Sequence, residues 1–132
     1  MKFDHIGVFV STIDSGRKYL ESILHIANWT DPIEDPVQKV IVQFGIDKSG
    51  IRYEIIAPCG EGNPVQPLLL QSKNILNHVA YNVDDIDIEI KRLQVERCIL
   101  ISGPSPAVAF NSNKIAFLYT PLRFIIELIE NK

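Results

Sequence analysis

Two histidines and two glutamates occur in this chain at one constant offset. The step from His5 to His78 (78 − 5 = 73) equals the step from Glu54 to Glu127 (127 − 54 = 73). Each histidine lies on an apolar, strand-like segment, and each glutamate lies on a later one. Imidazole nitrogens and carboxylate oxygens bind divalent transition metals and also transfer protons. The common offset therefore predicts a duplicated module with one polar site shared by its two copies.

The environment of the two glutamates indicates what this site requires. Glu54 and Glu127 are flanked by large apolar residues, where an uncompensated carboxylate would cost several kcal/mol. Two imidazoles and two carboxylates around one divalent cation form a neutral set and leave positions for water or substrate. Zinc, nickel, cobalt, manganese and ferrous iron suit these ligands, whereas calcium is disfavoured by the histidines.

Three other interpretations of the same residues need no metal. Each histidine could be an ordinary core or edge residue, since buried polar groups mark functional sites only as a tendency. Glu54 could pair with Arg52, which shares its strand face. Both histidines could also be protonated and paired with the glutamates in a pocket that only binds. The common offset of all four residues favours the metal site.

The repeat extends beyond these four residues. Small residues, Gly7 and Ala80, follow the histidines by two positions, so space is expected beside each imidazole. Internal repetition of this kind decides the fold class. Three pairs of segments align without a gap: 3–14 with 76–87, 42–44 with 115–117, and 53–56 with 126–129.

Hydrophobic periodicity predicts the elements that carry these residues. The first half reads as a strand at 3–10, a helix after the capping residues 11–14, a loop at 30–36, and strands at 38–44 and 51–56. The helix is expected to bury Ile13, Gly16, Leu20, Ile23 and Leu24.

The second half repeats this order of elements. It reads as a strand at 76–83, a helix after the cap at 84–85, and strands near 98–102, 113–119 and 124–130. The second helix is expected to bury Ile86, Ile90 and Leu93. Each module is therefore a strand, a helix and about three strands, which predicts an α+β fold of two tandem βαβββ modules.

Size and composition predict one domain. The chain of 132 residues is long enough for one core, formed by modules 1–58 and 76–132 and a Gly- and Pro-rich linker at 59–75 with a short helical turn at 68–71. The net charge of −3 gives no reason to expect nucleic acid as a partner. No apolar run approaches the roughly 20 residues that cross a membrane. Cys59 and Cys98 are expected to be reduced thiols of a cytoplasmic protein.

These motifs resemble the vicinal oxygen chelate superfamily, which includes glyoxalase I, methylmalonyl-CoA epimerase, extradiol dioxygenases and bleomycin-resistance proteins. The chain looks most like the methylmalonyl-CoA epimerase branch. The matching segments are Phe3-Asp-His-Ile-Gly7, Glu54-Ile-Ile-Ala-Pro58 with Gly60-Glu-Gly-Asn-Pro-Val65, residues 78–87, Ile115-Ala-Phe-Leu118 and Ile126-Glu-Leu-Ile129.

The resemblance implies a fold, a cofactor and an activity. It implies one glyoxalase-like domain over 1–132, with a cupped mixed sheet around a central cleft. One divalent metal ion would be bound by His5, Glu54, His78 and Glu127. The activity would be an isomerase that removes the α-proton of an acyl-CoA-like thioester and stabilises the enolate on the metal. Glu127 would be ligand and general base, and Glu54 the alternative base. The expected partners are a small-molecule substrate and a second copy in a homodimer.

One departure from the family pattern leaves other functions open. In well-studied epimerases a second glutamate lies on the strand after the first helix, and Val40 occupies that position here. Two alternatives are a glyoxalase I type lyase (lactoylglutathione lyase), which uses the same four ligands, and a non-catalytic protein that binds a small molecule or confers resistance by sequestering it.

Overall fold

The computed structural model of the chain describes residues 1–63, 65–71 and 76–131. Its contacts divide the chain into a first unit, His5–Asn77, and a second unit, which consists of Met1–Asp4 and His78–Lys132. This division cuts the first strand, because the residues before His5 belong to the second unit. The organisation of 1–132 as a single domain, with modules 1–58 and 76–132 and the linker 59–75, stays a prediction.

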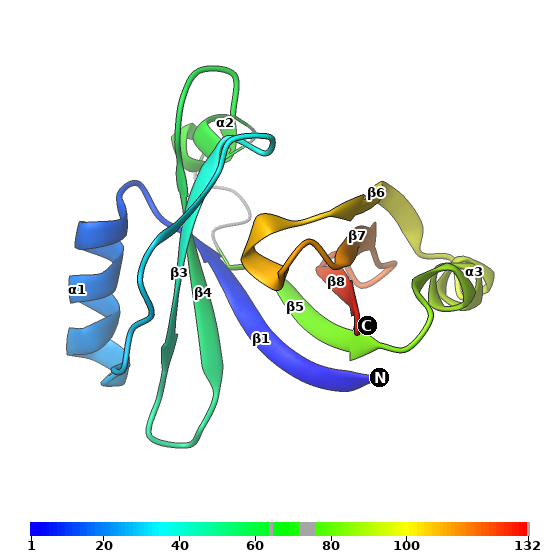
Figure 1. The fold of residues 1–132 in the computed structure, drawn as a ribbon, viewed down its shortest axis with the longest axis horizontal. Helices are drawn as coiled ribbons and strands as arrows, with labels where there is room; N and C mark the ends of the chain where they lie inside the picture. The colour runs from blue at the N-terminus through cyan, green and yellow to red at the C-terminus, as the bar shows by residue number, and fades with distance from the viewer. Residues whose placement is uncertain (64, 72–75, 132) are drawn as a thin grey trace. The chain divides into compact units, whose positions relative to one another are not determined.

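Among the residues that the structure describes, the first unit contains three whole strands, most of β1 and two helices (Figure 1). The strands are hydrogen-bonded in the order β2-β3-β4-β1, with β1 parallel to β4 and the other pairs antiparallel. The elements are β1 (Lys2–Phe9), α1 (Ile13–Leu24), β2 (Ile33–Asp35), β3 (Val40–Ile46), β4 (Arg52–Pro58) and α2 (Val65–Leu70).

The second unit repeats this order with β5-β8-β7-β6, in which β5 is parallel to β8. Both halves therefore follow the succession strand, helix and three strands, which confirms the predicted α+β class and its tandem βαβββ modules. The elements are β5 (Leu76–Val83), α3 (Ile86–Val95), β6 (Ile99–Pro106), a 3-10 turn η1 (Val108–Phe110), β7 (Lys114–Tyr119) and β8 (Ile125–Glu130).

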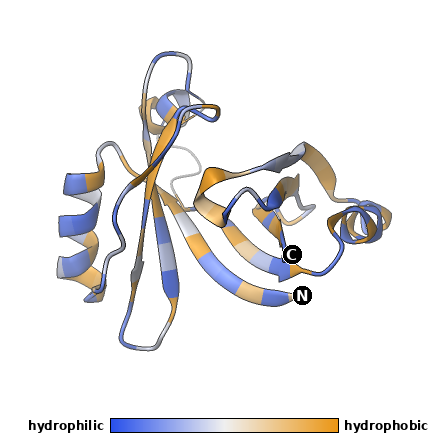
Figure 2. Ribbon diagram, in the orientation of Figure 1, coloured by the Kyte–Doolittle hydropathy of each residue, from blue (hydrophilic) through white to orange (hydrophobic). Residues whose placement is uncertain are grey.

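Both long helices begin at the predicted capping residues. The Thr12 hydroxyl accepts a hydrogen bond from the backbone N–H of Ser15 at 3.1 Å, and the Asp85 carboxylate accepts one from Ile88 at 3.1 Å. These bonds satisfy backbone donors that have no partner inside the helix. Figure 2 shows both polar and apolar colours along α1 and α3, as expected for helices that bury one face.

The predicted apolar stripe of α1 is correct at Gly16 and Leu20 and wrong at its end. Ile23 is 50% exposed and Leu24 is 43% exposed. The reason is that the helix stops at His25, which adopts the left-handed conformation (φ 55°), and Ile26 donates its N–H back to the Leu20 carbonyl. His25 also donates its N–H to the Glu21 carbonyl, which is the αL type of helix ending, and Ile26 then packs in the core in place of the two exposed residues.

The predicted loop at 30–36 is also wrong in part, because it contains strand β2. Ile33 pairs with Val42 and Asp35 pairs with Val40 at the edge of the sheet. Prolines on both sides hid this strand in the sequence, although proline is tolerated where an edge strand begins or ends. The Asp35 carboxylate then accepts hydrogen bonds from the N–H groups of Val37 and Gln38, at 3.0 Å each, and forms the turn into β3.

Two other elements are longer than predicted. Strand β6 continues to Pro106, because register shifts at Leu100/Ser102 and at Ser102/Ser105 accommodate its glycine and prolines at the sheet edge. Helix α2 begins at Val65, ahead of the turn predicted at 68–71. Positions 64 and 72–75 of the predicted linker lie outside the described residues.

Each long helix covers one face of the sheet in its own unit. In the first unit Leu20 and Ile26 pack on Ile55 of β4. In the second unit the three residues of α3 that were predicted to be buried are buried, and they pack on Leu118 and Leu128. These helix residues are Ile86, Ile90 and Leu93. In the part of the chain that the structure describes, no helix has the length and apolar character needed to cross a bilayer.

We predict that replacing isoleucine by alanine will have a large effect on the free energy of unfolding at a buried position of α3 and a small effect at an exposed position. Ile90→Ala should lower the free energy of unfolding by about 2–5 kcal/mol, because a buried isoleucine loses its packing and leaves a cavity. Ile88→Ala on the same helix, where the side chain is 63% exposed, should change it by less than about 0.5 kcal/mol. Urea unfolding measures both, and equal losses would contradict the assignment of the buried face.

Candidate metal centre

The first unit places His5 beside Glu54. Strands β1 and β4 are parallel, and Gly7 is paired with Glu54. His5, two residues before Gly7, points to the same face of the sheet. Its Nε2 lies 3.4 Å from Glu54 Oε1, and both side chains are buried. The sequence analysis expected both residues at one site, and the structure brings this pair together.

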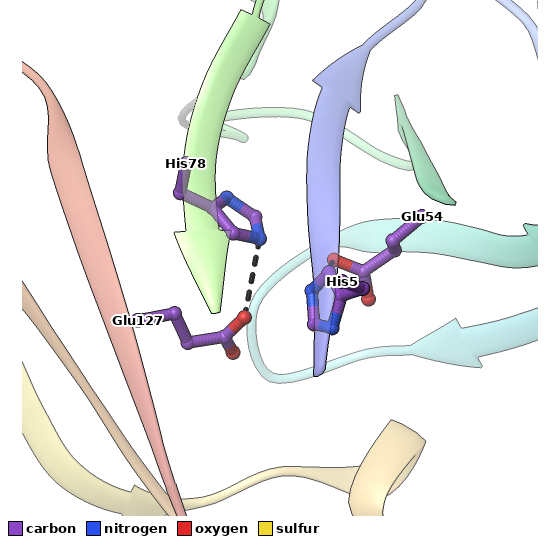
Figure 3. A group of neighbouring side chains, drawn as sticks. All are labelled: His5, Glu54, His78 and Glu127. Carbon is purple, nitrogen blue, oxygen red and sulfur yellow. Dashed lines mark ion pairs between the residues drawn. The ribbon is translucent and has the colours of Figure 1, made fainter. Parts of the chain in front are cut away.

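The second unit contains the matching pair. Strands β5 and β8 are parallel, and Ala80 is paired with Glu127. His78 Nε2 lies 3.1 Å from Glu127 Oε1, with both side chains buried, and Figure 3 shows the carboxylate facing the imidazole. The register that joins each small residue to its glutamate is thus repeated at the offset of the sequence repeat, since 80 − 7 equals 127 − 54.

Two phenylalanines complete the repeated arrangement. The Phe44 ring meets the His5 ring edge to face at 5.5 Å between centroids, and the Phe117 ring meets His78 at 5.6 Å. Across each antiparallel pair, Phe44 is the partner of Glu54 and Phe117 is the partner of Glu127. The sequence analysis did not assign them to the site, although their offset (117 − 44), which equals that of the histidines, was the available signal.

Both glutamates lie on the sheet face opposite to the helix of their own unit. Their neighbours along the strand, Ile55 and Leu128, belong to the clusters that pack on α1 and α3. Because successive side chains of a strand alternate between faces, Glu54 and Glu127 point away from those helices. Each carboxylate is therefore buried by residues other than the helical core.

The atoms of each pair are spaced as two ligands of one ion would be. Nitrogen and oxygen ligands at about 2.1 Å from a metal are about 3.0–3.4 Å apart when the angle between them is about 90–109°. The observed separations of 3.4 and 3.1 Å fall within this range. All four side chains are buried and belong to residue types that could hold a divalent ion. The donor set therefore fits a metal.

A positive charge lies on the same face of the first unit. Arg52 precedes Glu54 by two residues, and its guanidinium carbon lies 3.9 Å from the centroid of the Phe44 ring. A guanidinium at this distance makes a cation–π contact. Phe44 thus contacts both Arg52 and His5.

The position expected for a second glutamate is buried and apolar. Val40 is 8% exposed and pairs with Asp35 and Pro58. Asp35 shares its face, but its carboxylate holds the turn that leads into β3. Glu34 pairs with Ile41, so it points to the opposite face, where its carboxylate accepts a hydrogen bond from the Cys59 thiol at 3.4 Å.

Comparison with known protein families and sequences gives three results. The model of the Glyoxalase/Bleomycin resistance protein/Dioxygenase superfamily matches residues 4–117. An uncharacterized protein of Bacillus subtilis, YqjC, is 29% identical over 89% of this chain and 81% of that protein. The ethylmalonyl-CoA/methylmalonyl-CoA epimerase of Cereibacter sphaeroides is 23% identical over 89% of this chain and 87% of that protein.

Solved structures resemble the chain over nearly all of its length. A hypothetical protein from Bacillus halodurans C-125 has a TM-score of 0.82 at 22% identity, covering 99% of this chain and 94% of that one. Methylmalonyl-CoA epimerase from Mycobacterium tuberculosis has a TM-score of 0.77 at 20% identity, covering 99% and 88%. A methylmalonyl-CoA epimerase in complex with methylmalonyl-CoA has a TM-score of 0.78 at 17% identity, covering 98% and 94%. These similarities confirm the predicted glyoxalase-like fold.

We predict that Glu34 controls the reactivity of Cys59. Both cysteines are free; Cys59 is partly exposed and Cys98 is buried. The hydrogen bond to Glu34, with burial and the carboxylate charge, raises the pKa of the Cys59 thiol. Glu34→Gln should bring that pKa down towards its usual value, so more thiolate should be present at pH 8 and iodoacetamide should label Cys59 several-fold faster.

The control for this prediction removes a carboxylate that does not contact the thiol. Glu61→Gln removes one negative charge from the loop that follows Cys59, as Glu34→Gln removes one near the thiol. This control variant should leave the labelling rate of Cys59 unchanged. Mass spectrometry of the labelled peptides separates Cys59 from Cys98. Equal rates in the wild type and Glu34→Gln would show that the hydrogen bond does not govern this thiol.

Proposed function

The chain belongs to the Glyoxalase/Bleomycin resistance protein/Dioxygenase superfamily, and we propose that it is a divalent-metal-dependent isomerase. The reaction is removal of the proton next to the carbonyl of an acyl-CoA-like thioester, as in a methylmalonyl-CoA epimerase. The observation that carries this proposal is the pair of buried histidine–glutamate contacts, His5 with Glu54 and His78 with Glu127, related by one offset.

We assign both pairs to one metal ion. A single ion with two imidazole and two carboxylate ligands has a neutral inner set, which compensates the burial of both glutamates. The edge contacts of Phe44 and Phe117 hold the imidazole rings in position. Zinc, nickel, cobalt, manganese and ferrous iron all accept these ligands.

The chemistry divides between the ion and the two glutamates. When bound, the ion supplies a Lewis acid that stabilises negative charge on the carbonyl oxygen of the thioester. Glu127 takes the α-proton as general base and returns it to the enolate, and Glu54 is the alternative base. Val40 cannot take this role, and Asp35 is engaged by the turn that follows it.

The comparisons support the substrate class through proteins that share the fold. The relative from Cereibacter sphaeroides is an epimerase of ethylmalonyl-CoA and methylmalonyl-CoA, and a structural neighbour binds methylmalonyl-CoA. We propose that this chain also binds a small CoA thioester. A homodimer and a cytoplasmic location complete the proposal, and size-exclusion chromatography with light scattering tests the first of these.

The metal content of histidine variants tests whether one ion is shared. We expect about one divalent ion per chain in the wild type by elemental analysis. His5→Asn and His78→Asn should each weaken metal affinity by more than about 100-fold, because loss of an outer-shell partner alone costs about 10–100-fold. His25→Asn is the matched control, since His25 is exposed and asparagine tolerates its left-handed backbone. Two ions per chain would contradict a shared ion. Metal loss in one of the two histidine variants but not in the other would contradict it as well.

Proton exchange tests the reaction itself. Wild-type protein should exchange the α-proton of methylmalonyl-CoA for deuterium, measured by NMR. Glu127→Gln keeps a ligand oxygen and loses the base, so exchange should fall by about 10²–10⁴-fold.

Glu130→Gln is the control on the same strand, because Glu130 is also buried and its carboxylate accepts a hydrogen bond from the N–H of Ile86 at the start of α3. Exchange should persist in this variant. Turnover of methylglyoxal with glutathione and no exchange on the thioester would favour the lyase. Failure of both reactions in a protein without metal would favour a non-catalytic binding protein.

A further inference from the structure

A row of apolar side chains leads away from the histidine of the second unit. His78 on β5 is paired with Ile125 on β8, which is paired in turn with Tyr119 on β7. Tyr119 is paired with Ile99 on the edge strand β6. Residues that are paired across a sheet point to the same face. Ile125, Tyr119 and Ile99, which we call the apolar row, therefore lie on the sheet face that carries His78.

The apolar row becomes more exposed with distance from this histidine. His78 is buried and Ile125 is half-buried, whereas Tyr119 is 36% and Ile99 is 64% exposed. Single exposed apolar residues are common on protein surfaces and need no explanation. Three in one row form a continuous apolar surface, and this surface begins at a buried imidazole of the candidate metal centre.

The same face of the second unit is covered in the other direction along the strands. Ile129, two residues after Glu127, and its partner Ile115 are buried. They pack with Ala107 and Phe110, at the two ends of the 3-10 turn η1. A ligand held at the candidate metal centre can therefore extend within this unit over the apolar row, but not over the segment around Ile115.

The first unit does not repeat the apolar row. At the offset of the repeat, Arg52 corresponds to Ile125 and Ile46 corresponds to Tyr119 (119 − 46 equals 125 − 52). An alkyl chain laid over a guanidinium would remove water from a charged group, which costs free energy. The second unit is therefore the side that suits an apolar group.

We propose that the apolar row binds an alkyl chain of the acyl group, so that this protein prefers acyl thioesters with a chain of several carbons over those with a short chain. The inference rests on the proposed function, which holds the reacting end of the thioester at the candidate metal centre, and it refines the substrate class. Neighbouring strands lie about 4.8 Å apart, so the row from Ile125 to Ile99 spans about 10 Å. An extended octanoyl chain, with carbon–carbon bonds of about 1.5 Å, reaches a similar distance.

A series of straight-chain thioesters tests the apolar row by length. Isothermal titration calorimetry on zinc-loaded protein should show affinity rising from butanoyl-CoA through hexanoyl-CoA to octanoyl-CoA. The rise should be about twofold for each methylene, because a half-covered methylene gains about half of the transfer free energy of a buried one. Free CoA, which has no acyl chain, should bind no more tightly than butanoyl-CoA.

Two positions should affect different parts of the chain. Ile99→Thr, at the far end of the row, should weaken octanoyl-CoA binding by about 3–5-fold, the loss of about two half-covered methylenes, and change butanoyl-CoA binding by less than about twofold. Tyr119→Ala, in the middle, should weaken hexanoyl-CoA and octanoyl-CoA alike. Tyr119→Phe keeps the ring and should keep the preference for longer chains.

The matched control is Ile88→Thr, which makes the same change at an isoleucine of α3 that is 63% exposed and lies outside the row. It should leave the three affinities unchanged. Affinities that do not rise with chain length, equal losses in Ile99→Thr and Ile88→Thr, or equal weakening of all three thioesters by Ile99→Thr would overturn the inference.

Measurements of α-proton exchange separate this inference from the proposed function. A preference for longer chains that depends on Ile99, without exchange on any thioester, would uphold the apolar row and reject the isomerase. Exchange on methylmalonyl-CoA without a preference for longer chains would reject the apolar row and uphold the isomerase. Protein that binds none of the thioesters would overturn both.

Discussion

A buried carboxylate must be compensated, and this requirement governs the arrangement of both units. Glu54 and Glu127 are each more than nine-tenths buried on strands that would otherwise be apolar. A histidine nitrogen lies within 3.4 Å of each. Removing a charge from water costs several kcal/mol unless a partner offsets it. The pairs therefore have to be positioned by well-packed strands.

Parallel pairing supplies that position. In each unit the first strand lies beside the last one, which brings a histidine and a glutamate that are far apart in the sequence into contact. A slip by a single position in either strand would turn the glutamate towards the helix and bury it among aliphatic side chains. The clusters around Ile55 and Leu128 oppose such a slip, because these residues would then lose their packing on α1 and α3. The hydrophobic core thus sets the register of the polar site.

The sequence predicted what repeats and missed what depends on local backbone geometry. The constant offset selected the two histidines and two glutamates that the structure brings together in pairs, and the capping residues located both long helices. Strand β2 was missed because its pairing is decided by β3, further along the chain, and its flanking prolines resemble a loop. The exposure of Ile23 and Leu24 depends on the left-handed backbone at His25, which ends the helix. Hydrophobic periodicity in the sequence does not reveal this backbone conformation. Phe44 was visible in the repeat, but an aromatic residue on a strand is usually only core.

Symmetry and asymmetry have different consequences in a duplicated protein. The residues that are identical in both units, such as His5 and Glu54, answer a demand that both units share, the compensation of a buried charge. Residues that differ between the units can make different contacts with the two ends of an asymmetric small ligand. By the offset of the repeat, Arg52 of the first unit corresponds to Ile125 of the second, and Val40 corresponds to Asn113. Substitutions that change the selectivity of this fold are therefore best sought where the repeat breaks, because changes at the repeated positions remove the charge balance itself.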